Sequence, residues 1–204
     1  MKTKFLLFLT FLIFSIFVFF VYNFIVRGCN CKGSDSHAIL YNGIYYELLI
    51  GKSIKPYCGI LKSDKNGLRS VIEYKYGVKH GIEKKYFENG NVQLEAHYNN
   101  SLLHGEFIGW YENGMRAIHM SYLNGAENGE RQALYRNGSP YLRMNYKDDK
   151  KDGEFMIWYQ NDLPQEQWAK TGTLKEVGWY KENQKIKFVT FDESGVVTDK
   201  SRIK

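Results

Sequence analysis

The feature that most constrains the fold of this chain is a repeat with a period of 24 residues. Glycines mark it at Gly81, Gly105, Gly129 and Gly153. Two aromatic columns keep the same spacing, at Tyr74, Tyr98, Tyr122 and Tyr146 and at Phe87, Tyr111, Tyr135 and Tyr159. Three columns in strict register predict an array of like units, each of which buries its apolar side against its neighbours.

Each unit has the pattern of two β-strands. Residues 94–98 alternate apolar and polar side chains, which places Leu94, Ala96 and Tyr98 on one face of a strand. The second strand, such as residues 106–111, ends in an aromatic pair and then Glu-Asn-Gly, a tight-turn signal because Asn and Gly tolerate a positive φ. We therefore predict an all-β fold, an elongated antiparallel sheet of repeated hairpins. The glycines assigned to its turns are Gly81, Gly105, Gly129, Gly153, Gly90, Gly114 and Gly138.

The stretch HGEFIGWYENG, residues 104–114, contains a histidine, two acids and large aromatics, as the edge of an active site would. Comparison with its copies in the other repeats argues against this interpretation. Its first position is filled in successive units by His80, His104, Asn128 and Asp152. These side chains share a preference for turns and do not share one acid–base or metal chemistry. Glu112 is likewise replaced by Arg136 and Gln160. The stretch is therefore interpreted as a turn signal, and we predict a protein that is not an enzyme.

Other candidates for chemistry are few. His37 follows Gly-Ser-Asp-Ser in a polar stretch and is interpreted as part of a solvated spacer. His97 and His119 fall on the polar face of successive first strands, with Arg143 next, which leaves a shared ligand site or a plain solvated face. The chain contains no phosphate-binding loop, dinucleotide glycine pattern or H-E-x-x-H motif. No catalytic residue, cofactor or metal site is predicted.

Two adjacent aromatic columns are the better functional candidates. One holds Tyr86, Trp110, Leu134 and Trp158, and the other holds Phe87, Tyr111, Tyr135 and Tyr159. Neighbouring residues of a strand point to opposite faces, so both columns cannot share one core. We predict that the second column faces outward and binds a partner protein, because tyrosine joins an apolar ring to a hydroxyl that water can reach. The alternative is a ladder that only stabilises the sheet.

The first residues predict a membrane anchor. Residues 5–26 carry no charge and would span about 33 Å as a helix, at roughly 1.5 Å per residue. Lys2 and Lys4 before this segment favour a cytoplasmic N-terminus and an extracytoplasmic repeat domain. The alternatives are a lipoprotein attached at Cys29, after Val-Arg-Gly, and a cleaved, secreted chain. A disulfide between Cys31 and Cys58 stays open.

The predicted organisation has four parts. Residues 1–34 form the anchor and linker, residues 35–66 a degenerate N-terminal cap, residues 67–162 four hairpin repeats, and residues 163–204 a degenerate repeat and C-terminal cap. The net charge of +6 includes four positive charges within residues 1–34, where no acid is present. The other 170 residues carry only +2, without a basic block, so nucleic acid is not an expected partner.

The repeat resembles a known family. The alternation of Y-x-N-G-x-x-H-G-E with W-Y-E-N-G is similar to the MORN-variant repeat, and TLKEVGWYKEN at residues 173–183 fits the same pattern. The resemblance covers about residues 67–195 and extends to the YwqK-type antitoxins of toxin–antitoxin systems. It implies a curved antiparallel sheet, no catalytic residues, and a cognate toxin protein as the partner. The alternative is a scaffold of the cell envelope, or a lipid-associated MORN protein, without a toxin partner.

Overall fold

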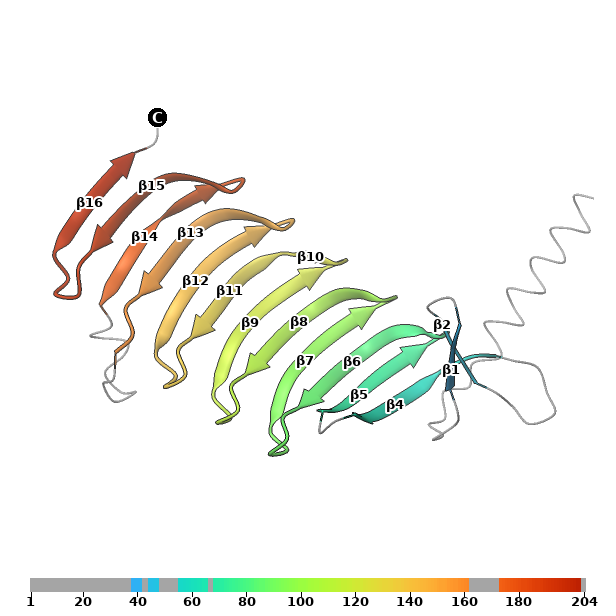
Figure 1. Cartoon of the computed structure of the whole chain (residues 1–204). Coiled ribbons are helices and arrows are strands. Elements are labelled where there is room, and N and C mark those ends of the chain that lie inside the picture. Colours follow the sequence, from blue (N-terminus) through green and yellow to red (C-terminus); the bar gives the residue numbers. More distant parts are fainter. Residues whose placement is uncertain (1–37, 42–43, 48–54, 66–67, 162–172, 203–204) are drawn as a thin grey trace, which may run out of the picture. The chain divides into compact units, whose positions relative to one another are not determined.

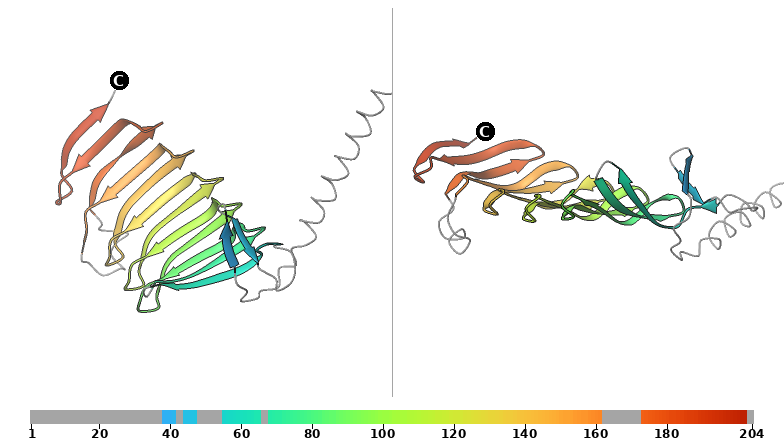
Figure 2. Two further views of the ribbon diagram at one scale, coloured as in Figure 1. Left: turned by 45° about the vertical axis from the view of Figure 1, so that its right-hand side comes forward. Right: turned by 60° about the horizontal axis from the view of Figure 1, so that its bottom comes forward.

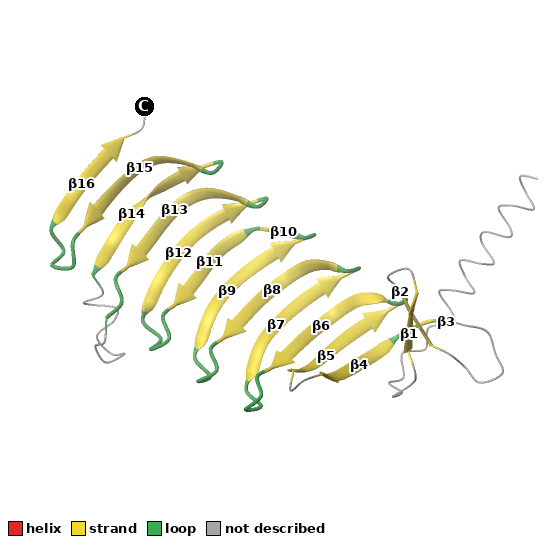
Figure 3. Cartoon of the chain, viewed as in Figure 1, coloured by secondary structure: helices red, strands yellow, loops and turns green. Residues whose placement is uncertain are grey.

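A computed structural model describes residues 38–41, 44–47, 55–65, 68–161 and 173–202, and all of its regular elements are strands (Figure 3). No helix in these ranges is long and apolar enough to cross a membrane. The predicted anchor, residues 1–34, lies outside the described residues, as do Cys29 and Cys31. The described part of the chain thus confirms the prediction of an all-β fold.

The chain divides into two compact units, Met1–Leu61 with Glu73–Val78 and Lys62–Ile72 with Lys79–Lys204. In the first unit, β1 (Ala38–Tyr41), β2 (Ile44–Glu47) and β3 (Lys55–Pro56) form an antiparallel sheet in that order. Tyr57 is 1% exposed and packs edge-on against Tyr74, with ring centroids 6.2 Å apart. Beside it, the Cys58 Sγ accepts a hydrogen bond from the Tyr76 amide at 3.1 Å.

The larger sheet has 13 strands that follow one another in chain order, with the short β10 paired to β9 (Figure 1). Its first strands are β4 (Gly59–Lys65), β5 (Leu68–Lys75), β6 (Val78–Tyr86), β7 (Val92–Asn99), β8 (Leu102–Trp110) and β9 (Arg116–Leu123). The others are β10 (Ala126–Glu127), β11 (Gly129–Leu134), β12 (Pro140–Lys147), β13 (Lys150–Trp158), β14 (Leu174–Lys181), β15 (Gln184–Phe191) and β16 (Val197–Arg202). Neighbouring strands from β6 to β16 pair antiparallel, as the hairpin repeat predicts.

The two-residue turns at one end of the sheet tie successive hairpins together. In each turn both residues have a positive φ, as a type I′ turn requires. The turns are Asn100-Ser101, Asn124-Gly125, Asp148-Asp149 and Glu182-Asn183. The amide of Ser101 donates to the carbonyl of Lys79 at 2.8 Å, one hairpin earlier, and that of Gly125 donates to Leu103 in the same way. Each turn is therefore also a link between neighbouring hairpins.

The Asn-Gly loops at the other end link hairpins through side chains. Gly90, Gly114 and Gly138 lie in these loops with φ between 85° and 91°. The asparagine before each glycine is not among the residues with positive φ and uses its amide group instead. Asn113 Oδ1 accepts the Met115 amide at 3.1 Å, while its Nδ2 donates to the Arg136 carbonyl of the next loop at 3.0 Å. Asn89 and Asn137 repeat both contacts.

The remaining glycines lie in strands, although the sequence pattern assigns them to turns. Gly81, Gly105 and Gly153 are inside β6, β8 and β13, and Gly129 is the first residue of β11. Their φ values run from 98° to 116°. In the pairing of β7 with β8, Ala96 faces Phe107 but Tyr98 faces Leu103, so β8 bulges by two residues around Gly105. A bulge needs a residue at positive φ, which explains the glycine without a loop.

From β7 to β14 the two faces of the sheet differ. We call the tyrosine face the one that carries Tyr98, Tyr122, Tyr146 and Tyr180, and the polar face the one that carries Glu95, His119 and Arg143. The buried hydrophobic residues Ala96, Met120, Met144 and Phe155 belong to the tyrosine face. Strands β6–β16 form one layer (Figure 2), so most other side chains stay half-buried.

Candidate functional site

The predicted partner-binding column is tied to the backbone of the next hairpin. The Tyr111 hydroxyl donates to the Leu134 carbonyl at 2.8 Å, and the Tyr135 hydroxyl donates to the Trp158 carbonyl at 2.9 Å. Tyr159 makes the equivalent bond to Phe191 at 3.0 Å. Each of these three tyrosines thus bridges two hairpins. Phe87 stands in the same column but has no hydroxyl, so it cannot make this bond.

Neither aromatic column is buried and neither is fully exposed. All eight side chains of the two columns, Tyr86, Trp110, Leu134, Trp158, Phe87, Tyr111, Tyr135 and Tyr159, are half-buried. The expected division into one core column and one surface column requires a second layer over one face, and the second unit is a single layer. The side chains of both columns therefore keep surface that water or a partner can reach.

The tyrosine face carries ion pairs that cross the bulges. Lys79 Nζ lies 2.7 Å from Glu83 Oε2, and Glu83 is 3% exposed. Arg131 Nε lies 2.8 Å from Glu127 Oε1 in the third repeat, with the signs of the two positions reversed. In each case the cation also lies over a tyrosine ring, Lys79 at 4.7 Å from Tyr98 and Arg131 at 4.4 Å from Tyr146.

These contacts shift the titration of the tyrosine face. Burial and the Glu83 carboxylate raise the pKa of Tyr98 to about 12. Burial also raises the pKa of Tyr122 and Tyr146 above the ordinary tyrosine value. Burial opposes the ionisation of Glu83, but Lys79 outweighs it and holds the pKa of this carboxyl below its usual value. The fold therefore favours neutral hydroxyls on these tyrosines and an ionised Glu83 carboxylate.

The histidines of the polar face lie beside carboxylates of neighbouring strand positions. His97 Nε2 is 3.4 Å from Glu95 Oε1, and His119 Nε2 is 3.6 Å from Glu106 Oε1. Arg143, the next member of the His119 column, pairs with Glu130. His104 instead lies near a turn, with Nδ1 3.1 Å from Asn124 Oδ1. Among the described residues no three His, Cys, Asp or Glu side chains gather as a metal site requires, and His37 lies outside this range.

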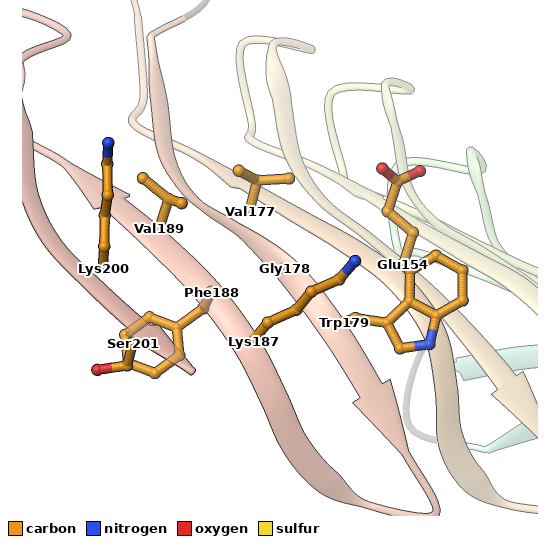
Figure 4. Close-up of a pocket in the computed structure, with 9 residues that line it drawn as sticks. All are labelled: Glu154, Val177, Gly178, Trp179, Lys187, Phe188, Val189, Lys200 and Ser201. Atoms are coloured by element: carbon orange, nitrogen blue, oxygen red, sulfur yellow. The ribbon is translucent and has the colours of Figure 1, made fainter. Parts of the chain in front are cut away.

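An open groove lies across β13, β14, β15 and β16 (Figure 4). Its volume is about 710 Å³, and its lining is Glu154, Val177, Gly178, Trp179, Lys187, Phe188, Val189, Lys200 and Ser201. Trp179 is 39% exposed, and Lys187 Nζ lies 5.5 Å from the centroid of its ring. None of these residues is among those predicted from the sequence to bind a partner. The signal was present in the columns, because Val177 and Trp179 stand where earlier repeats carry polar residues.

The model of the MORN repeat variant family matches residues 79–100 and 103–124, two adjacent repeats. No curated protein matches the chain. Among solved structures, a chain of the Glycosylation Associate Protein (Gap123) complex from Streptococcus agalactiae is similar, at 16% identity and a TM-score of 0.31. That likeness covers 48% of this chain and 18% of the other.

Proposed function

We propose that this chain is a non-enzymatic repeat protein that binds a partner protein through its sheet and is held at a membrane by residues 5–26. The observation that carries the proposal is the exposure of the two aromatic columns. A sheet of hairpins that leaves Trp110, Tyr111 and Trp158 only half-buried keeps part of each aromatic side chain accessible, and accessible aromatic side chains are typical of protein interfaces.

The substitutions between repeats support a binding role over catalysis. An active site needs one set of groups at one place, whereas the position of His104 is filled by Asn128 and Asp152 in later repeats. On the polar face His97 lies beside Glu95 of its own strand, whereas His119 with Glu106 and Arg143 with Glu130 are cross-strand pairs. Such pairs stabilise a sheet surface without a chemical step.

The resemblance to YwqK-type antitoxins makes a cognate toxin the first partner to test. An antitoxin is essential only while its toxin is present. Loss of viability on removal of this gene alone, with rescue by removal of an adjacent gene, would support the antitoxin role. Unchanged viability would favour the alternative, a cell-envelope scaffold.

Partner binding itself is tested by photo-cross-linking of the full chain in cells. The cross-linking amino acid p-benzoylphenylalanine is placed at Tyr141, which is 43% exposed and whose ring centroid lies 5.0 Å from that of Tyr135. The matched control position is Leu123, which is 51% exposed and lies at the turn end of β9. We expect a discrete protein adduct from position 141 that is absent from position 123. No protein adduct from position 141 would refute partner binding at the aromatic columns.

A further inference from the structure

The last complete hairpins carry a polar face unlike that of the earlier repeats. One column of this face holds Glu95, His119 and Arg143, and then Val177. A second holds His97, Ser121 and Asn145, and then Trp179. A third holds Glu106, Glu130 and Glu154, and then Lys187. At β14 and β15, two polar columns therefore become apolar and an acidic column becomes basic.

At this end of the polar face, three charged side chains make no direct ion pair within the described part of the chain. Glu106 has His119 beside it, and Glu130 pairs with Arg143. Val177 occupies the equivalent place near Glu154, so this carboxylate makes no ion pair within the described part of the chain. Neither Lys187 nor Lys200 has an ion-pair partner among the described residues. The groove thus combines an exposed indole, aliphatic side chains and charged groups of both signs that make no direct ion pair among the described residues.

The strand register arranges these side chains in two rows. Trp179 faces Glu154 on β13 and Lys187 on β15. Val177 faces Val189, which in turn faces Lys200 on β16. The groove is therefore apolar along its floor, negative at β13 and positive at β15 and β16. Figure 4 shows Glu154, Trp179 and Lys187 side by side above the same surface.

We propose that this groove binds a short extended segment of a partner protein in which an acidic side chain lies next to an apolar one. The apolar side chain packs on Val177 and Val189, and the carboxylate meets Lys187 and Lys200. Three strand spacings of about 4.8 Å separate β13 from β16, which about four residues of extended chain would cover. Glu154 disfavours a polyanion such as nucleic acid, and the groove volume of about 710 Å³ suits a segment of this size.

This inference rests on the proposed function and names the chemistry of the bound segment. It is tested with the full chain in lipid nanodiscs and a phage-displayed library of random octapeptides. The decisive variant, Val177→Arg/Trp179→Asn, grafts the residues Arg143 and Asn145 of the preceding repeat onto the groove. Because these residues already fit that position of the fold, we expect unchanged far-ultraviolet circular dichroism and a similar melting temperature.

The wild-type chain should enrich peptides that place Asp or Glu beside an aliphatic or aromatic residue. A resynthesised peptide should bind the graft variant at least about tenfold more weakly, equivalent to about 1.4 kcal/mol. Lys187→Glu/Lys200→Glu should enrich basic peptides instead. The charge-matched control, Lys62→Glu/Lys147→Glu, changes exposed lysines outside the groove and should select the wild-type peptides. The absence of enrichment on the wild type, or equal binding by a folded graft variant, would overturn the inference.

The partner adduct from position 141 separates the two proposals. Loss of this adduct in the graft variant would support the groove as the docking site of the same partner. Retention of the adduct in that variant would overturn the groove inference and leave partner binding intact. Enrichment of acidic peptides by a wild-type chain that forms no adduct would uphold the groove and refute binding at the aromatic columns.

Discussion

At the scale of single residues, backbone conformation explains the most regular glycine column. Gly105 has a φ of 102°, and a Cβ added there would lie 3.3 Å from the Cβ of His97. The residue before it, His104, is half-buried, and its Nδ1 lies 3.1 Å from Asn124 Oδ1 in the neighbouring turn. The column is therefore set by the bulge and not by the histidine that precedes two of its members.

We predict that Gly105→Val destabilises the protein while His104→Asn does not. The valine would be forced into a φ that β-branched residues avoid, at a cost of about 1–3 kcal/mol. Asn128 already occupies the histidine position in the third repeat, so His104→Asn is the matched control. Urea unfolding of both variants measures the difference. A folded His104→Asn chain that lost partner binding would return His104 to the list of functional residues.

At the scale of one hairpin, the ion pair across the bulge joins two strand positions that a regular strand would separate. In a regular strand residues 79 and 83 would share a face but stand about 13 Å apart, at about 3.3 Å per residue. Here Gly81, whose φ is 98°, lies between them, and Lys79 Nζ is 2.7 Å from Glu83 Oε2. The third repeat uses the same geometry with Glu127 and Arg131, and in both repeats a cation covers the tyrosine of the next strand. The two positions therefore accept the acid and the base in either order.

The charge swap Lys79→Glu/Glu83→Arg, made together with Lys85→Ala, should therefore keep the stability of the wild type. This triple variant recreates the pair of the third repeat, including a guanidinium over Tyr98. Lys85→Ala is included because that repeat has Ala133 at the position of Lys85 and a lysine there would repel the new guanidinium. Lys79→Met alone leaves the buried Glu83 carboxylate with the more distant Lys85, whose Nζ is 3.8 Å away, and should cost about 1–3 kcal/mol. Thermal unfolding measures both variants. A swap as harmful as the single change would show that polarity matters at this position.

The hairpins should also lose stability at alkaline pH. The pKa of Tyr98 is about 12 in the fold, against an ordinary value of 10.0, so folding favours its neutral hydroxyl. The contribution of the neutral Tyr98 hydroxyl to folding stability is complete below pH 10 and disappears as the pH rises through 12. Circular dichroism during titration measures the loss, and Tyr98→Phe should reduce it. A wild-type chain and variant with identical alkaline profiles would contradict the assignment.

At the scale of the whole molecule, the array consists of hairpins that are joined by the same kinds of bond from one repeat to the next. Each hairpin bonds to the next through its turns, its Asn-Gly loop and its tyrosine hydroxyl, as Ser101, Asn113 and Tyr111 illustrate. All of these links recur at or near the 24-residue period. Stability of such an array is close to a sum over units and their interfaces.

Deletion of residues 104–127, one full period, should thus leave a shorter sheet that still folds. Asn128 would then follow Leu103 and take the place of His104 with the register intact. Deletion of residues 104–126 removes one residue fewer and would move each following side chain to the other face of its strand. Circular dichroism and cooperative urea unfolding distinguish the two products. A cooperative transition for both deletions would contradict a register set by the period.

The sequence by itself determined the hairpin period, the alternation of apolar and polar side chains around Ala96, and the Asn-Gly loops such as that of Gly114. These features depend on spacing and local turn chemistry along one chain, which a sequence displays directly. Only the tertiary structure decided that Gly105 lies in a bulge and that Tyr111 is half-buried. A bulge arises from the count of residues on two paired strands, and burial depends on whether another layer covers a face. The groove at Trp179 also depends on strand pairing. It forms where β13, β14, β15 and β16 lie side by side and place the apolar and basic residues that replace the earlier polar and acidic ones next to one another.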